Sequence, residues 1–404
     1  MVRADDTPGA RTPVDDHIAR VLSMLERLRA RVPETVPLAD ALGRILTRDV
    51  LSPIDLPPFR NSQMDGYAVR SVDVASAPVS LPAVGEVAAA PGAPAALRPG
   101  TAVKIMTGAP VPDGADAIVP VEDTLSANGY VSISRGRAAG EYVRDAGSDL
   151  RSGDVILSGG TVLASRHLAA LAAAGITDVE VTARVRVAVI STGSELVAPG
   201  EQLAPGQIFD SNGVALAAAV RATGSQVVLE GRVRDEIDEL EALLDAAIAL
   251  KAELILTSGG VSMGDHEVVR QFLEPHDALV DVLAMQPGGP QALAHWHEVP
   301  VVGFPGNPVS SQLSFEIFVA PTLRELAGLP ARVVETRVLD SAVRSIAGRR
   351  QFLRGRRAGR DGVTLVGGPS SHLVAALAAS DVLIVIPEDV VEVAAGDSVE
   401  TWQL

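Results

Sequence analysis

The chain has 404 residues, a formal net charge of −16, 3% aromatic residues and no cysteine. The negative charge opposes general binding to nucleic acids and membrane surfaces, and the few aromatic rings argue against a platform for stacked bases. The lack of cysteine excludes disulfides, thiolate zinc sites and cysteine nucleophiles. At this length we expect two to four domains.

The N-terminal part predicts a tail followed by a helix. Residues 1–13 lack the apolar segment of a signal peptide, and we expect a disordered tail there. Apolar side chains recur at helical spacing over 14–32, and Pro33 should end this helix. A short helix and an extended piece follow, and prolines within 53–58 mark a boundary. No apolar run reaches the length of a membrane span, so we expect a cytoplasmic protein without membrane contact.

The next region predicts β structure. Short valine-rich pieces alternate with glycine- and proline-rich turns over 59–142, a pattern typical of a small barrel or sandwich. Turns, short strands and a helix that ends near Gly175 follow up to about residue 183.

From residue 184 onward, apolar strands alternate with helices, which favours a parallel doubly wound sheet. One expected helix has Asp210, Ser211 or Asn212 as its N-cap and stops at Gly224. Residues 331–404 return to short β segments and should form a small C-terminal β domain. We expect strands within 184–192, 225–235, 252–262 and 299–304. We expect helices within 210–224, 236–250 and 308–326.

Three turns share one character: 191–195, 257–262 and 303–308 each follow an apolar strand and contain glycine. In a parallel sheet they meet at the carboxyl edge, where glycines and helix N-termini favour anions. The sequence therefore indicates a phosphate or oxyanion pocket. Ordinary strand-to-helix turns would explain the glycines equally well, but the nearby acids less well. Walker GK[ST] and GxGxxG motifs are absent.

Acidic residues gather beside these turns, and carboxylates next to a phosphate pocket indicate Mg²⁺. Taken singly, each acid is more often a helix cap or turn former. Asp65 and Asp149 stand in turn-like sequence elsewhere. The acids near the turns are Glu195, Asp210, Asp235, Asp265 and Glu267.

A basic segment interrupts the acidic chain over 344–360. It contains no acid and could hold a phosphorylated ligand, although a solvated hairpin rim fits the charge as well. RNA binding through this arginine segment is opposed by the net charge. Its members are Arg344, Arg349, Arg350, Arg354, Arg356, Arg357 and Arg360.

Seven motifs together resemble the molybdopterin molybdenumtransferase family, which includes MoeA and the E domain of gephyrin. The likeness runs from about residue 15 to the C-terminus, and MDGYA, MTGAP, SGGVS and PGNPVS at these spacings are highly specific in combination. In chain order the motifs are NSQMDGYAVR, KIMTGAPVPDGADAIVPVE, AGSDLRSGD, STGSEL, DSNG, SGGVSMGD and GFPGNPVSS.

The resemblance implies a multidomain α/β protein that forms an L-shaped homodimer with a site shared between subunits. It also implies Mg²⁺-dependent insertion of molybdate into adenylylated molybdopterin with release of AMP. A molybdopterin adenylyltransferase would act upstream. The implied domains are an elongated segmented domain (14–52 and 143–183), an inserted β domain (53–142), a central doubly wound, molybdopterin-binding-like α/β domain (184–330) and a C-terminal β barrel (331–404).

Motif matching and the turn chemistry assign roles to individual residues. Catalytic roles fall to Asp65, Thr107, Asp149, Glu195, Asp235 and Glu267. Metal ligation falls to Glu195, Asp235, Asp265 and Glu267. Cofactor binding falls to Ser191, Thr192, Gly193, Ser258, Gly259, Gly260, Val261, Ser262, Pro305, Gly306, Asn307, Pro308, Arg349, Arg350 and Ser371.

The chain departs from the family pattern where many members carry KPGKP. Here the segment is 286–290, QPGGP, and both lysines are absent. We hypothesise that the arginine segment, Arg349 and Arg350 above all, compensates for them. One alternative, which depends on Gln286 and Gly289, is a degenerate paralogue that binds molybdopterin without efficient metal insertion. A scaffold protein is a further alternative, disfavoured because no partner domain is evident.

Overall fold

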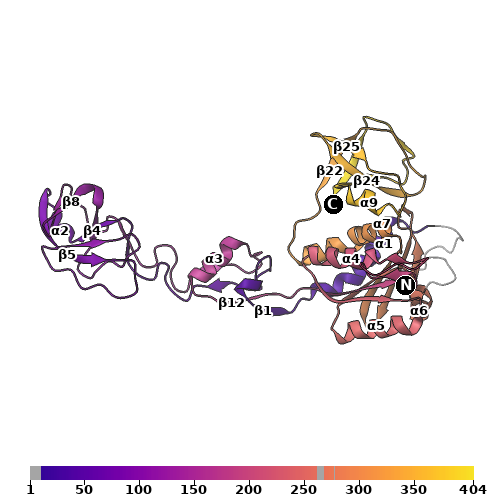
Figure 1. Ribbon diagram of the computed structural model, residues 1–404, viewed down its shortest axis with the longest axis horizontal. Helices are drawn as coiled ribbons and strands as arrows, with labels where there is room; N and C mark the ends of the chain where they lie inside the picture. The colour runs from indigo at the N-terminus through magenta and orange to yellow at the C-terminus, as the bar shows by residue number, and fades with distance from the viewer. Residues whose placement is uncertain (1–10, 262–267, 277) are drawn as a thin grey trace. The chain divides into compact units, whose positions relative to one another are not determined.

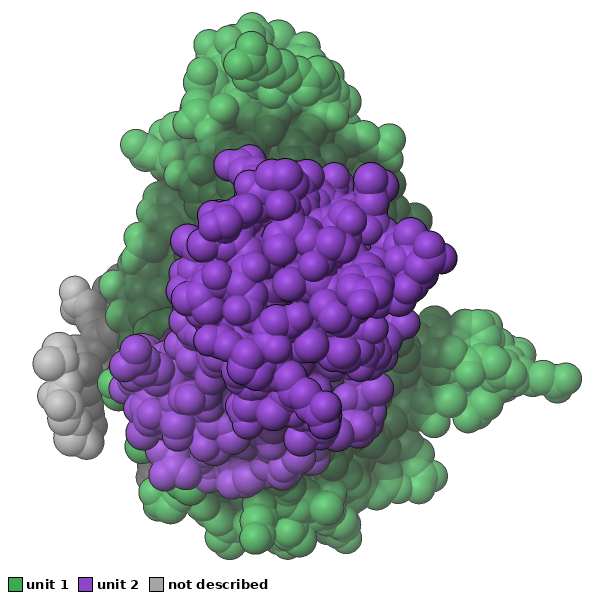
Figure 2. Space-filling view, turned by 90° about the vertical axis from the view of Figure 1, so that its left-hand side faces the viewer, with its two compact units in different colours: residues 1–32, 182–404 green, residues 33–181 purple. Residues whose placement is uncertain are grey.

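The computed structural model describes residues 11–261, 268–276 and 278–404. By their internal contacts these residues form two compact units. Figure 2 colours unit 1, Met1–Val32 with Thr182–Leu404, and unit 2, Pro33–Val181. None of the helices in the described ranges has the length and apolar character that crossing a membrane requires.

Unit 1 is built around a six-stranded sheet in the order β16-β13-β17-β21-β20-β18. The first four strands are parallel, as predicted, and the last two complete the edge in antiparallel pairing. The strands are β13 Arg186–Thr192, β16 Gln226–Val233, β17 Leu254–Ser258, β18 Leu279–Val282, β20 Pro290–Trp296 and β21 Val299–Phe304. A short parallel pair, β14 Leu196–Val197 and β15 Ile208–Phe209, lies outside this sheet.

Helices cover both faces of the sheet (Figure 1). Val187 and Val189 of β13 pack with α1, α4 and α7, whereas Ala188 and Ile190 pack with α5 and α6, because successive strand residues point to opposite faces. Burial on both faces explains the continuous apolar strands. The helices are α1 Val14–Leu25, α4 Ser211–Ala222, α5 Ile237–Ala249, α6 Val268–Leu273, α7 Pro308–Ser314 and α8 Ala320–Leu326, with a π-helical stretch Phe315–Val319 between the last two and a 3-10 turn Glu274–His276.

The ends of helix α4 agree with its sequence. Asp210 is the N-cap, and its side chain accepts a hydrogen bond of 2.9 Å from the backbone N–H of Gly213. At the other end Gly224 has a φ of +77°, a left-handed conformation that suits glycine after a helix. The cap is one of the three residues predicted, and the predicted stop at Gly224 is confirmed.

The N-terminal segment differs from the prediction in two ways. Helix α1 ends at Leu25 and continues only as a 3-10 turn, Glu26–Arg29, and it packs within unit 1 rather than with the remainder of 14–52. Thr12 bridges Leu283 in parallel, so residues 11–13 are not the disordered tail we expected. Backbone hydrogen bonds, invisible in the local sequence, hold this segment. Residues 1–10 lie outside the described range.

The C-terminal part of unit 1 is a closed β barrel, as predicted. Strands β24-β25-β22-β28-β26 pair in this order, and β26 pairs back to β24. Strand β19, Met285–Gln286, runs parallel to β24 and joins the barrel to the segment before β20. The elements are β22 Val334–Leu339, β23 Val343–Arg344, β24 Arg350–Ala358, β25 Gly362–Leu365, α9 Val374–Ala378, β26 Val382–Ile386, β27 Glu392–Val393 and β28 Ser398–Gln403.

Unit 2 contains the predicted β region as a six-stranded sheet in the order β7-β4-β6-β5-β9-β8. The rest of the unit consists of short strand pairs and two helices, α2 and α3. The sheet strands are β4 Gly66–Val69, β5 Val79–Val87, β6 Ala102–Ile105, β7 Ala117–Pro120, β8 Thr124–Ala127 and β9 Tyr130–Ile133. The other elements are β1 Pro33–Pro37, β2 Val50–Leu51, β3 Asn61–Ser62, α2 Ser71–Val74, β10 Val143–Arg144, β11 Val155–Leu157, α3 Ser165–Ala173 and β12 Asp178–Thr182, with 3-10 turns Leu38–Asp40 and Val121–Asp123.

Candidate functional site

A cavity of about 1060 Å³ lies in unit 1 at the carboxyl ends of β13, β17 and β21. This is the edge of a parallel sheet at which ligands bind. The segment after β19 and the loop before α9 also line it. Of the predicted site residues, the cavity is lined by Thr192, Gly193, Glu195, Asp235, Ser258, Gly259, Gly260, Val261, Pro305, Gly306, Asn307, Pro308, Arg349 and Ser371.

Two loops at the cavity are tied together by reciprocal hydrogen bonds. The backbone N–H of Ser194 donates to Asp235 Oδ2 at 3.0 Å, and the backbone N–H of Asp235 donates to Ser194 Oγ at 3.1 Å. Glu195 is exposed, and its carboxylate accepts no hydrogen bond from the described residues. The two hydrogen bonds with Ser194 therefore fix the position of Asp235. The oxygens of the Glu195 carboxylate stay available to a ligand in the cavity.

Ser191 and Asp210 have a structural task next to the cavity, which Asp210 also lines. Ser191 is fully buried, and its hydroxyl donates to Asp210 Oδ1 at 3.0 Å. The same oxygen caps helix α4. Ser191, predicted to bind the cofactor, is not among the residues that line the cavity.

A buried polar network supports the glycine turns. Asn212 Nδ2 donates to Ser258 Oγ at 2.8 Å and to the carbonyl oxygen of Gly306 at 2.7 Å. The hydroxyls of Ser258 and Ser311 are 3.0 Å apart. The network joins the first turn of α4 to the turns after β17 and β21. Sequence reasoning treated Asn212 as a possible cap and missed this role, although the DSNG motif contained the signal.

Gly259 brings two strand ends close together. It has a φ of +98°, and a Cβ there would overlap the carbonyl oxygen of Thr192. Its backbone N–H donates to the carbonyl oxygen of Phe304 at 3.0 Å, so this N–H is used within the fold. Gly259 was predicted to bind the cofactor, but this N–H is not free to bind a phosphate.

The two adjacent arginines of the barrel behave differently. Arg349 is partly buried and lines the cavity. Arg350 does not line it, because its guanidinium donates to Asp15 at 2.7 and 2.9 Å and to Glu388 at 3.0 and 3.1 Å. The hydrogen bond to Asp15 is the main cause that raises the pKa of Arg350. Of the two arginines that we expected to replace the charge of the missing lysines, only Arg349 is therefore placed to contact a ligand in the cavity.

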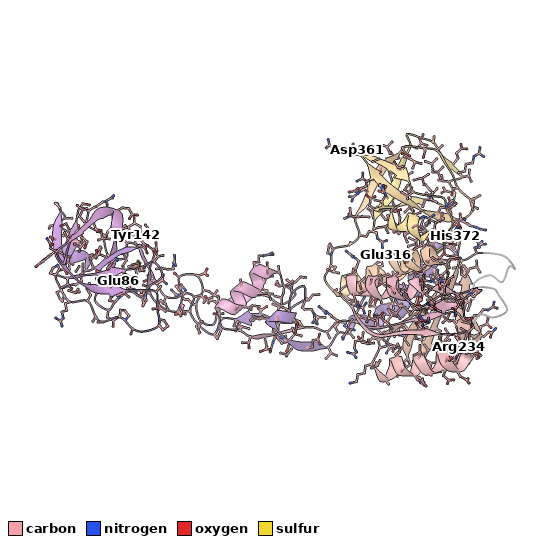
Figure 3. All side chains as sticks on the ribbon, viewed as in Figure 1. Glu86, Tyr142, Arg234, Glu316, Asp361 and His372 are labelled. Carbon is pink, nitrogen blue, oxygen red and sulfur yellow. The ribbon has the colours of Figure 1, made fainter. Side chains whose placement is uncertain are left out.

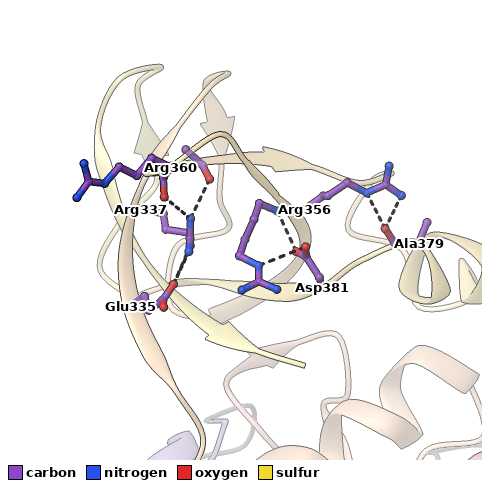
Figure 4. Close-up of polar contacts among 8 residues, drawn as sticks. Glu335, Arg337, Arg356, Arg360, Ala379 and Asp381 are labelled. Atoms are coloured by element: carbon purple, nitrogen blue, oxygen red, sulfur yellow. Dashed lines mark hydrogen bonds and ion pairs between the residues drawn. The ribbon is translucent and has the colours of Figure 1, made fainter.

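Most other arginines of the segment serve the barrel itself. Arg354 is fully buried and donates to the carbonyl oxygen of Gly368. Figure 4 shows Arg356 donating to the carbonyl oxygen of Ala379, at 2.7 and 3.0 Å. It also shows Arg337 reaching the carbonyl oxygen of Arg360 at 3.2 Å. These contacts argue against one continuous basic surface for RNA.

Two basic side chains of the cavity were missed. Arg11 lines it and donates from Nη1 to the carbonyl oxygen of Leu283 at 3.2 Å. It fell within the predicted tail, where no local signal marked it. His372, labelled in Figure 3, stands in the loop before α9 with its Nδ1 2.8 Å from the hydroxyl of Ser370. In the same loop the carbonyl oxygen of Ser371 accepts the N–H of Val309 at 3.1 Å.

Three further residues that were predicted to be catalytic, Asp65, Thr107 and Asp149, belong to unit 2. The backbone N–H and the hydroxyl of Thr107 both donate to Asp65 Oδ1, at 2.7 and 2.8 Å. These bonds, the backbone one first, lower the pKa of Asp65 below its ordinary value. Asp149 is exposed, and its backbone N–H donates to the carbonyl oxygen of Leu56 at 2.9 Å. The side chains of Asp65 and Thr107 thus form one preorganised group.

Comparison with known families covers almost the whole chain. Residues 12–175 match the MoeA N-terminal region (domains I and II), 188–325 match the family described as a probable molybdopterin binding domain, and 336–404 match the MoeA C-terminal region (domain IV). A Mycobacterium tuberculosis protein named molybdopterin molybdenumtransferase 2 is 44% identical over 393 residues, covering 94% of this chain and 97% of its own. The chain belongs to the MoeA family of molybdopterin molybdenumtransferases.

Other relatives agree with this assignment to the MoeA family. A Haemophilus influenzae protein named molybdopterin molybdenumtransferase is 33% identical over 393 residues, covering 93% of this chain and 97% of its own. The crystal structure of a molybdopterin biosynthesis MoeA protein from Pyrococcus horikosii superposes with a TM-score of 0.78 at 33% identity, covering 98% and 99% of the two chains. These relatives confirm the MoeA-like fold that the motifs predicted. They also confirm the prediction that the chain is an enzyme of molybdenum cofactor biosynthesis.

The residues around the cavity can be tested for a fit to Mg²⁺. The described residues contain no group of three histidine or acidic side chains placed to share a metal ion. Mg²⁺ is, however, commonly held by one or two carboxylates together with waters and substrate phosphates. Glu195 and Asp235, which both line the cavity, fit that smaller donor set. Ser262, Asp265 and Glu267 lie outside the described residues.

Proposed function

We propose that this MoeA-family enzyme inserts molybdate into adenylylated molybdopterin and releases AMP. One observation carries the proposal: a single cavity joins the glycine turns of the α/β sheet, the carboxylates of Glu195 and Asp235, and Arg349 of the barrel. Its volume of about 1060 Å³ suits a ligand the size of a nucleotide-linked pterin. Both the phosphoanhydride and molybdate are anions, so such a site needs cations and donors as well as acids.

The turns of the cavity would bind and orient the phosphoanhydride. Gly259 and Gly306 bring the turn backbones close together, and a Cβ at Gly306 would stand 3.4 Å from the Cα of Gly259. The network of Asn212, Ser258 and Ser311 holds these turns from behind. A rigid turn places donors before the substrate arrives, which lowers the cost of reorganisation in the transition state.

The carboxylates supply the second half of the proposed chemistry. Glu195 and Asp235 would hold Mg²⁺, which when bound would offset negative charge and polarise the phosphoanhydride. Asp235 is held in place by Ser194, so its orientation does not depend on the substrate. Arg349 would hold anionic oxygens from the barrel side.

We further propose that the active enzyme is a homodimer and that Asp65 of the partner subunit completes the cavity. Thr107 keeps Asp65 ionised and fixed, which suits a carboxylate that acts on a bound substrate rather than one that merely forms a turn. A molybdopterin adenylyltransferase would supply the adenylylated substrate. The dimer predicts that two inactive variants, one altered at Asp65 and one at Glu195, regain activity when mixed and allowed to exchange subunits.

The test is direct reconstitution. The purified protein is incubated with adenylylated molybdopterin, molybdate and Mg²⁺, and both AMP release and active molybdenum cofactor are measured. We expect AMP release to depend on molybdate and on Mg²⁺, and to be lost in Glu195→Gln. Retention of the adenylylated substrate without AMP release would instead support the degenerate paralogue, and AMP release independent of both ions would contradict the proposal.

A further inference from the structure

Arg11 is held at the cavity by the backbone of its neighbour. The N–H of Thr12 donates to the carbonyl oxygen of Val282 at 3.1 Å, and the N–H of Ala284 donates to the carbonyl oxygen of Thr12 at 2.7 Å. These two bonds fix the chain beside Leu283, to whose carbonyl oxygen Arg11 Nη1 donates at 3.2 Å. The N-terminal segment therefore delivers a guanidinium to a defined place.

The same stretch of chain carries Arg349 on its other side. The N–H of Arg350 donates to the carbonyl oxygen of Ala284 at 2.8 Å, and strand β24 continues the pairing at Met285 and Gln286. Ala284 is thus bonded to the segment of Arg11 through its N–H and to the segment of Arg349 through its carbonyl. Two arginines from opposite ends of the chain flank residues 284–289 and line one cavity.

Gly289 leaves the space that Arg11 occupies. A Cβ on Gly289 would stand 3.4 Å from Arg11 Nη1, so the guanidinium lies directly beside a position that has no side chain. Gln286 and Gly289 bring no charge to this part of the cavity. Among the described residues neither Arg11 nor Arg349 forms an ion pair with a carboxylate, unlike Arg350. A guanidinium has five N–H donors, and Arg11 uses one of them here.

We infer that Arg11 and Arg349 together bind the tetrahedral oxyanion substrate, molybdate, over residues 286–290. This inference rests on the proposed function. An unpaired guanidinium next to a neutral segment is matched by an anion with several acceptor oxygens, and charge-assisted hydrogen bonds from two sides fix its position. Arg11 is the cation that this chain recruits from its N-terminal segment, and Arg349 is its counterpart from the barrel.

The experiment separates molybdate from the other anion in the cavity, the phosphate of the pterin. Arg11→Ala is compared with wild type for the KM of molybdate, the KM of adenylylated molybdopterin and kcat. We expect the molybdate KM to rise by about tenfold to a hundredfold, the range for a lost charge-assisted hydrogen bond, with the other KM unchanged. Arg27→Ala, an exposed arginine of the same segment that does not line the cavity, serves as the matched control and should change neither.

A second variant tests whether charge at this place is what matters. In Arg11→Ala/Gly289→Lys the new side chain enters the space that Arg11 vacates, and its Cβ would meet only ordinary van der Waals contacts, at 3.5 and 3.6 Å, once the guanidinium is gone. This double variant should regain most of the molybdate affinity. A rise in the KM of adenylylated molybdopterin instead, or no change in either KM, would overturn the inference.

Direct binding keeps the inference distinct from the proposed function. Equilibrium dialysis of radiolabelled molybdate against each variant requires no turnover. If wild type releases no AMP but binds molybdate, and Arg11→Ala binds it at least tenfold more weakly, the proposed function fails and the oxyanion site stands. If wild type binds no molybdate, or Arg11→Ala binds it equally well, the oxyanion site is refuted whatever the reaction.

Discussion

Thr107 donates two hydrogen bonds, one from its backbone N–H and one from its hydroxyl, to a single oxygen of Asp65. The distances of 2.7 and 2.8 Å are those of strong bonds to a charged acceptor. Both bonds favour the ionised form and lower the pKa of Asp65. Asp65 of the MDGYA motif and Thr107 of the MTGAP motif are 42 residues apart in sequence. In the fold they are in contact, and Thr107 holds the Asp65 carboxylate ionised and in one orientation.

Asp65→Asn should remove the charge and keep the geometry. The amide oxygen of asparagine can still accept both bonds from Thr107, so we expect an unchanged thermal midpoint. AMP release should fall by about a hundredfold or more, since the group loses the charge that its surroundings are built to keep. Thr107→Val is the matched control: the pKa of Asp65, followed by carboxyl NMR, should rise toward its ordinary value. Full activity in Asp65→Asn would remove Asp65 from the proposed site.

The parts of the fold that were predicted correctly are those with local causes. Asp210 was recognisable as a cap because it precedes an apolar helix, and its carboxylate does accept the N–H of Gly213. The parallel sheet followed from the alternation of apolar strands and helices, and Val189 and Ile190 are buried on its two faces as that pattern requires. The place of the cavity could be predicted as well, because the glycine turns follow these strands and ligands bind at the carboxyl edge of a parallel sheet.

The parts that could not be predicted depend on distant contacts. Arg11 is separated from Leu283 by 272 positions, and nothing near it in sequence marks a partner. In the arginine segment, side-chain direction decided the outcome: Arg349 lines the cavity, Arg350 pairs with Asp15 and Glu388, and Arg354 is buried. Composition alone could not sort these residues, because all of them carry the same charge.

Arg349→Ala and Arg350→Ala should have different effects. Loss of Arg349 should reduce AMP release at fixed molybdate while the free energy of unfolding stays unchanged, because this side chain lines the cavity without an ion pair among the described residues. Loss of Arg350 should lower the free energy of unfolding by about 1 kcal/mol, since its partners are largely exposed. Urea denaturation and the AMP assay on both variants check this. Equal effects on both measurements would contradict the division of roles.

Gly66→Ala should destabilise the six-stranded sheet of unit 2. A Cβ at this position would overlap the carbonyl oxygen of Val119 in the neighbouring strand, and backbone on both sides cannot yield easily. We expect a loss of about 1 to 3 kcal/mol in the free energy of unfolding, the range for overpacking in a core. Gly368→Ala, where a Cβ would meet nothing within 4 Å, is the control and should be neutral by urea denaturation. A neutral Gly66→Ala would mean that strands β4 and β7 lie further apart.

His17 should make stability depend on pH. It is buried in α1 against the edge of Phe318, with ring centroids 4.7 Å apart, and its two ring nitrogens find no partner among the described residues. Burial first, and then the charge of Arg20, lowers its pKa to about 4 from the ordinary 6.5. Between pH 6.5 and pH 4 the ring of His17 is therefore mostly protonated in the unfolded chain and mostly neutral in the folded chain. The free energy of unfolding should fall by about 3 kcal/mol as the pH drops over this range.

Urea denaturation across this pH range checks the slope. His17→Leu should remove the part of the slope that comes from His17. Relative to wild type, the free energy of unfolding of the variant should therefore become more favourable as the pH falls toward 4. His295→Leu, which alters an exposed histidine on β20, should keep the wild-type slope. Parallel pH profiles for wild type and His17→Leu would show that the ring of His17 finds a hydrogen-bond partner when it takes up a proton, and that burial alone does not set its charge.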